Sequence, residues 1–136
     1  MKKSKFLYIL LGLSLFAPNF SCENEVYHQG RILYENFCQN CHMEDGTGLK
    51  GIIPPLKNSD FLLNNQEKLT CLIRKGITDT IVVNGKTYNQ PMPGNPKLTQ
   101  GDITNIINYI NQAWGNTIKP ILYDDVLKQF ETCRGY

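Results

Sequence analysis

Two cysteines and a histidine stand within five positions of the stretch NFCQNCHMEDGTG, as Cys38, Cys41 and His42. Such a group can bind zinc, perform thiol redox chemistry, form a structural disulfide or carry haem. A zinc site would need a second Cys or Cys/His pair, but the remaining cysteines stand singly and the other histidine is His28. A thioredoxin-like pair would end a strand and open a helix, and nothing upstream has the pattern of that strand.

The histidine that directly follows the second cysteine separates the last two possibilities. A disulfide across two intervening residues gives no reason for a histidine there. Attachment of c-type haem uses all three residues, because two thiols add to the haem vinyl groups while the imidazole of His42 becomes the proximal ligand of the iron. A C-x-x-C-H motif also arises by chance, so the surrounding elements must support this interpretation.

The N-terminal segment and the charge balance bound the class of protein. Residues 1–21 predict a secretory signal peptide, with three lysines ahead of the apolar run FLYILLGLSLFA, and an uncleaved anchor helix is the alternative. Residues 22–136 contain 11 Lys and Arg and 12 Asp and Glu, so their net charge is near −1. Their number suits one small domain. This balance excludes a basic footprint for nucleic acid.

Cys22 follows the predicted signal directly. Ser21 before it resembles the end of a bacterial lipobox, whose cysteine is lipidated, although Asn19 and Phe20 depart from the commonest pattern. We therefore expect an exported, periplasmic protein that a lipid on Cys22 tethers to the membrane.

Cysteine arithmetic agrees with this expectation. If haem takes the motif thiols, Cys71 and Cys133 can pair, which leaves Cys22 as the odd thiol. A disulfide would strap the C-terminal tail across the back of the helix that carries Cys71, and export permits it. Pairing cannot be deduced from sequence alone, so this remains open.

Helical patterns surround the motif. The pattern predicts a helix that begins at Val26 and runs into Cys38. Residues 43–63 are predicted to be a loop. Asn64 with Glu67 resembles a capping box at the start of a helix that ends at Gly76.

The second half of the chain has clearer signals. Asn84-Gly85 between two β-prone runs predicts a hairpin, and the stretch QPMPGNPKLT is too rich in proline for a helix or a central strand. Thr99 with Asp102 caps a helix whose apolar stripe is Ile103, Ile106, Ile107, Ile110 and Trp114. A last short helix after Pro120 puts Val126, Phe130 and Cys133 on one face.

Residues 26–114 resemble a class I cytochrome c, most similar to small bacterial mono-haem members. The resemblance rests on GRILYENFCQNCH, on the proline of IPPL, on the methionine of YNQPMPG and on LTQGDITNIINYI. It implies an all-α cytochrome c fold around covalent haem c, with the hairpin as an insertion and residues 115–136 as a C-terminal extension. It also implies that Gly30 lets Tyr109 pack closely between two crossing helices.

The resemblance implies the second iron ligand as well. Met92 is the expected ligand, because Met1 leaves with the signal and Met43 adjoins His42 on the wrong side of the haem. A core position for Met92 and a ligand role for His28 are the alternatives.

Two further roles concern the surroundings of the haem. The carbonyl of Pro54, or of the adjacent Pro55, would accept the Nδ1 proton of His42 and so orient the ring. Tyr88 and Trp114 could hydrogen-bond a haem propionate, or pack in the core.

Three function classes follow. We expect an electron carrier, a monomer rather than an enzyme, that exchanges single electrons between a donor protein and a terminal oxidase or reductase. The alternatives are a haem c subunit of a larger respiratory oxidoreductase and a haem peroxidase or gas-binding protein. The peroxidase hypothesis is weaker, since the segment around Met92 offers prolines but no histidine or arginine for acid-base chemistry.

Overall fold

The computed structural model describes residues 27–133, and the predicted signal peptide and Cys22 lie outside them. The chain is mostly helical, as expected, with short strands confined to residues 76–93. The helices that surround the motif are α2 (His28–Phe37), α3 (Gln39–His42) and α6 (Gln100–Gln112). No helix within 27–133 is long and apolar enough to cross a lipid bilayer.

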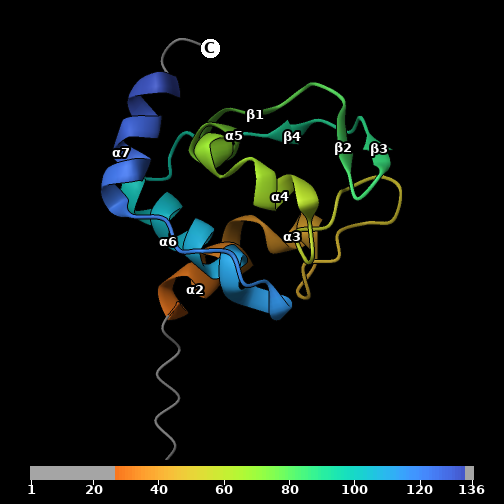
Figure 1. The fold of residues 1–136 in the computed structure, drawn as a ribbon, viewed down its shortest axis with the longest axis horizontal. Coiled ribbons are helices and arrows are strands. Elements are labelled where there is room, and N and C mark those ends of the chain that lie inside the picture. The colour runs from red at the N-terminus through yellow and green to blue at the C-terminus, as the bar shows by residue number, and fades with distance from the viewer. Residues whose placement is uncertain (1–26, 134–136) are drawn as a thin grey trace, which may run out of the picture.

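Helices α2 and α6 cross in close contact (Figure 1). Gly30 lies at the crossing, where a Cβ atom would overlap the carbonyl oxygen of Asn105 and the Cβ of Tyr109. This contact confirms the expected glycine and tyrosine pair. The Thr99 capping box is also present, because its hydroxyl accepts from the Asp102 amide at 3.1 Å and the Asp102 carboxylate accepts from the Thr99 amide at 2.9 Å.

The segment between His42 and Gly76 differs from the prediction in two places. Residues 43–63 are not all loop, because α4 (Asp60–Asn64) begins after Ser59, whose hydroxyl accepts from the Leu62 amide at 3.1 Å. The expected capping box is wrong, because Asn64 is the last residue of α4. A 3₁₀ turn (Gln66–Lys68) follows before α5 (Leu69–Lys75). Helices this short carry too little periodicity to be recognised from sequence.

Two small antiparallel sheets occupy residues 76–93. The predicted hairpin is confirmed as β2 (Ile81–Val83) and β3 (Lys86–Tyr88), with positive φ at both Asn84 and Gly85, as a type I′ turn requires. The second sheet joins β1 (Gly76–Ile77) to β4 (Met92–Pro93), a pairing that the sequence did not indicate.

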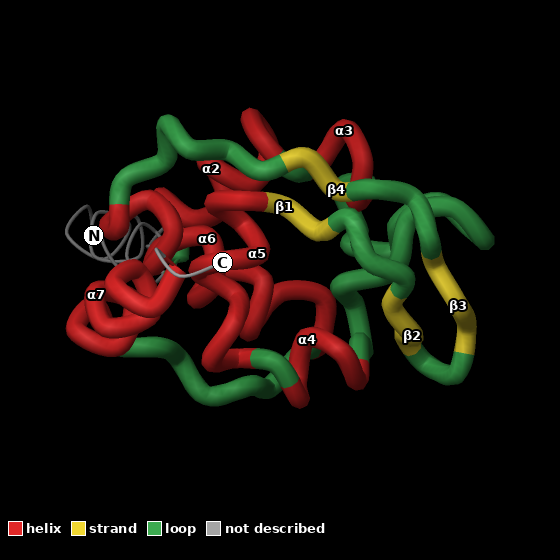
Figure 2. Tube along the Cα trace, turned by 90° about the horizontal axis from the view of Figure 1, so that it is seen from above, coloured by secondary structure: helices red, strands yellow, loops and turns green. Residues whose placement is uncertain are grey.

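The C-terminal helix α7 (Tyr123–Thr132) packs against α5 and α6, at the opposite end of the molecule from the hairpin (Figure 1, Figure 2). Cys71 and Cys133 form the disulfide that remained open above, with their Cα atoms 5.4 Å apart. Val126 and Cys133 are buried on the predicted face.

Trp114 departs from the predicted stripe. The other four members, all isoleucines of α6, are buried, whereas α6 ends at Gln112 and Trp114 lies in a 3₁₀ turn with φ 56°. Its ring packs on Gly46, and its indole Nε1 donates to the carbonyl oxygen of Glu44 at 2.8 Å. The indole N–H is therefore engaged by the backbone, and a role for Trp114 at a haem propionate is not supported.

Replacement of Gly30 should measure the importance of the helix crossing. Gly30→Ala should lower the free energy of unfolding by about 1–3 kcal/mol, because the added methyl must displace the backbone of α6. Gly101→Ala is the matched control, since Gly101 also lies in a helix but has only the Thr99 hydroxyl near its Cβ position. Guanidinium titration should show the control unchanged or more stable by up to about 1 kcal/mol. Equal stability of the two variants would contradict the close packing.

Candidate haem site

The motif occupies one helical turn. Helix α2 ends at Phe37. Cys38, with φ −122° and ψ −36°, separates α2 from α3. The amides of Cys41 and His42 both donate to the carbonyl oxygen of Cys38, at 3.1 and 2.9 Å. Residues three and four apart on a helical turn share a face, so the two thiols and the imidazole lie close together.

The thiols are poorly suited to redox chemistry in this environment. Cys38 is half-buried, Cys41 is exposed, and both are free. Burial, with a smaller contribution from Cys41, raises the pKa of Cys38 to about 11. A thioredoxin-type cysteine needs a lowered pKa, so that interpretation is disfavoured. Within residues 27–133 no three Cys, His, Asp or Glu side chains are grouped as a metal site.

His42 is buried and oriented by the loop that follows it. Its Nδ1 donates to the carbonyl oxygen of Pro54 at 3.2 Å, so the partner is Pro54 and not Pro55. Burial lowers the pKa of His42, and the hydrogen bond to Pro54 acts in the opposite direction. With Nδ1 occupied, the neutral ring has Nε2 left as its metal-binding nitrogen.

The loop around Pro54 is itself held against the histidine. The Gly48 amide donates to the His42 carbonyl oxygen at 3.0 Å, and Leu49 and Ile53 exchange backbone hydrogen bonds of 3.0 and 2.8 Å. A Cβ on Gly48 would overlap the backbone of Ile53 and Pro54. Only glycine therefore allows this close approach.

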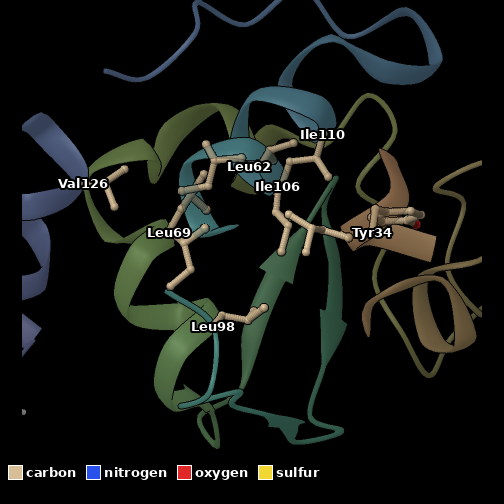
Figure 3. Close-up of a cluster of buried hydrophobic side chains, with 10 residues drawn as sticks. Tyr34, Leu62, Leu69, Leu98, Ile106, Ile110 and Val126 are labelled. Atoms are coloured by element: carbon tan, nitrogen blue, oxygen red, sulfur yellow. The ribbon is translucent and has the colours of Figure 1, made fainter. Parts of the chain in front are cut away.

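Two cavities that share lining residues extend from His42: the inner cavity, of about 80 Å³, and the outer cavity, of about 260 Å³. Both are lined by Cys38, His42, Pro54 and Met92, and the outer cavity also reaches Cys41 at its rim. The walls of the inner cavity are apolar side chains from α4, α5, α6 and the hairpin: Leu62, Leu69, Leu72, Ile73, Ile81, Val83, Ile106 and Ile110. Figure 3 shows Leu62, Leu69, Ile106 and Ile110 together in the cluster of buried hydrophobic side chains.

This lining fits haem c. An apolar macrocycle needs a water-excluding slot, two thiols at its rim, and donor atoms from opposite walls. Asp79 is the one carboxylate among the residues that line the two cavities. Tyr88 lines the outer cavity, and its contact with a propionate stays a prediction.

The rival ligands lie elsewhere. His28 is exposed on α2, where its Nδ1 is 3.3 Å from the Arg31 guanidinium. Met43 lines a surface groove with Tyr109 and Trp114. Neither His28 nor Met43 lines the two cavities.

Two features of the site were not predicted. Met92 is held by the β1–β4 pairing, in which it is opposite Ile77, and two-residue strands carry no sequence signal. Tyr34 belongs to the predicted helix that runs into Cys38, and it also lines the inner cavity, where its hydroxyl donates to the Met43 carbonyl oxygen at 2.6 Å. The one sequence feature that could have indicated this role is its position, one helical turn before Cys38.

Comparison with known proteins gives the class of protein independently of the site. The family model described as cytochrome c matches residues 27–114. A cytochrome c-552 of Thermus thermophilus is 28% identical over an alignment that covers 94% of this chain and 86% of that protein. A second cytochrome c-552 of the same species is 30% identical over 67% of this chain and 76% of its own length. The cytochrome c subunit of a quinone alcohol dehydrogenase from Gluconobacter oxydans is 25% identical over 64% of this chain and 18% of its own.

The buried hydroxyl of Tyr34 generates a pH-dependent prediction. Burial raises the pKa of Tyr34 above its ordinary value of about 10, so the unfolded chain ionises first. Its contribution to stability is fully present below about pH 10 and is lost as the pH rises further. Tyr34→Phe should cost about 1–2 kcal/mol at neutral pH through the lost hydrogen bond. Above pH 10 its stability should fall less steeply, by up to about 1.4 kcal/mol per pH unit.

Denaturant titrations between about pH 8 and 11.5 would measure both effects. The control Tyr123→Phe removes an exposed tyrosine and keeps the hydrogen bond of Tyr34, so its profile should follow the unchanged protein. Parallel profiles for Tyr34→Phe and the unchanged protein would show that Tyr34 does not set this dependence.

Proposed function

The chain belongs to the cytochrome c family. We propose here which of its residues hold the haem and set its reduction potential. Members of the family bind haem c covalently and transfer electrons, and this chain does the same. Cys38 and Cys41 form the thioether links. His42 and Met92 would hold the iron, an assignment that rests on one observation: both line the two adjoining apolar cavities.

Bound haem iron supplies one-electron exchange between its ferrous and ferric states. The protein contributes the surroundings. His42 is presented as a neutral imidazole, oriented by Pro54, and Met92 presents a soft thioether. Apolar walls disfavour the more highly charged ferric state, so ligand set and walls together raise the reduction potential.

We propose a carrier that has no catalytic reaction of its own. A peroxidase needs acid-base side chains beside an accessible sixth position, whereas Met92 occupies that side and His42 is the one imidazole in the cavity linings. The quinone alcohol dehydrogenase subunit keeps the alternative of a subunit role open for test. Co-purification from the native membrane would distinguish a carrier, which elutes alone, from a subunit.

We also propose that residues 22–136 form the mature domain, with 115–136 as an extension, after removal of 1–21. Bacterial cytochromes c of this kind are generally exported to the periplasm, which fits the Cys71–Cys133 disulfide. Lipid on Cys22 is the proposed tether. Fractionation tests it: Cys22→Ser should move the protein to the soluble fraction, and continued membrane retention would contradict the tether.

Replacement of Met92 tests the ligand assignment. Ferric Met92→Ala should lose the weak sulfur-to-iron absorption near the red end of the visible spectrum, bind cyanide readily and have a lower potential, because a soft ligand is removed. Met43→Leu is the matched control, since it removes the other methionine of the described chain and should keep the band. Retention of the band in Met92→Ala would refute the assignment.

The docking surface is the second testable part of the proposal. Phe37 and Ile52, 55% and 48% exposed, line the outer cavity beside Cys41, which gives the haem rim an apolar border. Partners, an electron donor and a terminal oxidase or reductase, would dock there through apolar contact. Stopped-flow electron transfer should slow less than about threefold between about 20 and 200 mM salt. A decrease of about tenfold or more would show that charge governs docking.

A further inference from the structure

The segment that carries Met92 is attached to the C-terminal end of α5. Strand β4 pairs with β1, so that Met92 is opposite Ile77 and Pro93 is opposite Gly76. The Asn95 amide donates to the Ile73 carbonyl oxygen at 2.9 Å. A Cβ on Gly76 would overlap the Met92 carbonyl oxygen. The backbone of Met92 therefore follows the position of α5.

Helix α5 is in turn attached to α7. The Cys71–Cys133 disulfide links them, and Gln129 of α7 accepts from the Thr70 amide at 3.3 Å and donates to the Gln66 carbonyl oxygen at 3.1 Å. The Arg74 guanidinium lies 4.3 Å from the centre of the Phe130 ring. Figure 2 shows α5 between α7 and the β1–β4 pair.

The two attachments use opposite sides of one short helix. Leu69, Leu72 and Ile73 of α5 line the inner cavity, while Cys71 points to α7. A seven-residue helix has little stability of its own and depends on its packing partners. The disulfide links α5 covalently to Cys133 at the end of α7, and it closes a chain segment of 62 residues.

We propose that the Cys71–Cys133 disulfide positions the Met92 segment through α5 and the β1–β4 pair, and that its reduction loosens this segment. The positioning of the segment does not depend on the proposed role of Met92 as an iron ligand. Only the functional consequence of the inference rests on that role. A dithiol is the required reductant: its two thiols give up two electrons and two protons, the Sγ–Sγ bond breaks, and Cys71 and Cys133 become thiols. Cys71 is half-buried, so a small dithiol can approach the bond from its side.

Amide hydrogen exchange of the ferrous holoprotein tests the positioning role. The Asn95 amide reports on the Met92 segment, and the Ile107 amide, in the buried α6, reports on global opening. In Cys71→Ser/Cys133→Ser, exchange at Asn95 should rise about tenfold or more relative to exchange at Ile107. If exchange accelerates equally at both amides, or does not accelerate at Asn95, the proposal is overturned. The disulfide would then have no selective effect on the Met92 segment.

Two controls complete the experiment. Ile103→Val removes a methyl from a buried residue that lines neither cavity, so it should lower global stability without selective exchange at Asn95. Treatment of the unchanged protein with a dithiol should reproduce the effect of the double variant, and the double variant itself should not respond. A response of the double variant, or no effect on the unchanged protein once its two thiols are shown to be free, would contradict the redox step.

Displacement by imidazole separates this inference from the ligand assignment. If both hold, imidazole should enter the ferric double variant about tenfold faster than the unchanged protein, since the Met92 segment opens more often. If Met92 is not a ligand, imidazole should enter both proteins at one rate while Asn95 still exchanges faster in the double variant. Equal entry in the presence of the Met92 absorption band would overturn the functional consequence of the disulfide.

Discussion

The contact between α2 and α6 at Gly30 fixes the geometry on which the rest of the structure depends. Helix α2 leads into the motif, so the crossing sets where Cys38 and His42 stand relative to the isoleucine face of α6. Tyr34, 1% exposed, extends this contact toward the cavity. Only a glycine permits the two backbones to approach so closely, and a wider separation would move the isoleucine wall of the candidate haem site away from His42.

Helix α5 connects the remaining parts. One side contributes apolar side chains to the inner cavity, the other is bound to α7, and its end continues into the strand that pairs with Met92. The two proposed iron ligands thus have unlike supports. His42 is oriented by a hydrogen bond to Pro54, whereas Met92 pairs with Ile77 of the strand that follows α5, the helix that the disulfide joins to Cys133.

The features that local chemistry specifies were predictable from the sequence. The haem motif, the hairpin at Asn84-Gly85 and the Thr99 cap each depend on a few adjacent residues, and the structure has the hairpin and the cap as expected. The β1–β4 pair was not predictable, because two-residue strands have no period and meet only when the tertiary fold brings them together. Trp114 was misplaced for a related reason, since packing on Gly46 overrides its helical spacing.

We propose that haem c lies in the two apolar cavities, held by His42 and Met92. Carbon-13 methyl NMR of the diamagnetic ferrous protein tests it most directly, because the ring current of a macrocycle shifts nearby methyl groups strongly upfield. We expect the methyl of Met92 to be shifted most, with smaller shifts for Leu69 and Ile106, and ordinary positions for Ile103 and Val126, which are buried but line neither cavity. A Met92 methyl at its ordinary position would show that Met92 does not lie beside the haem.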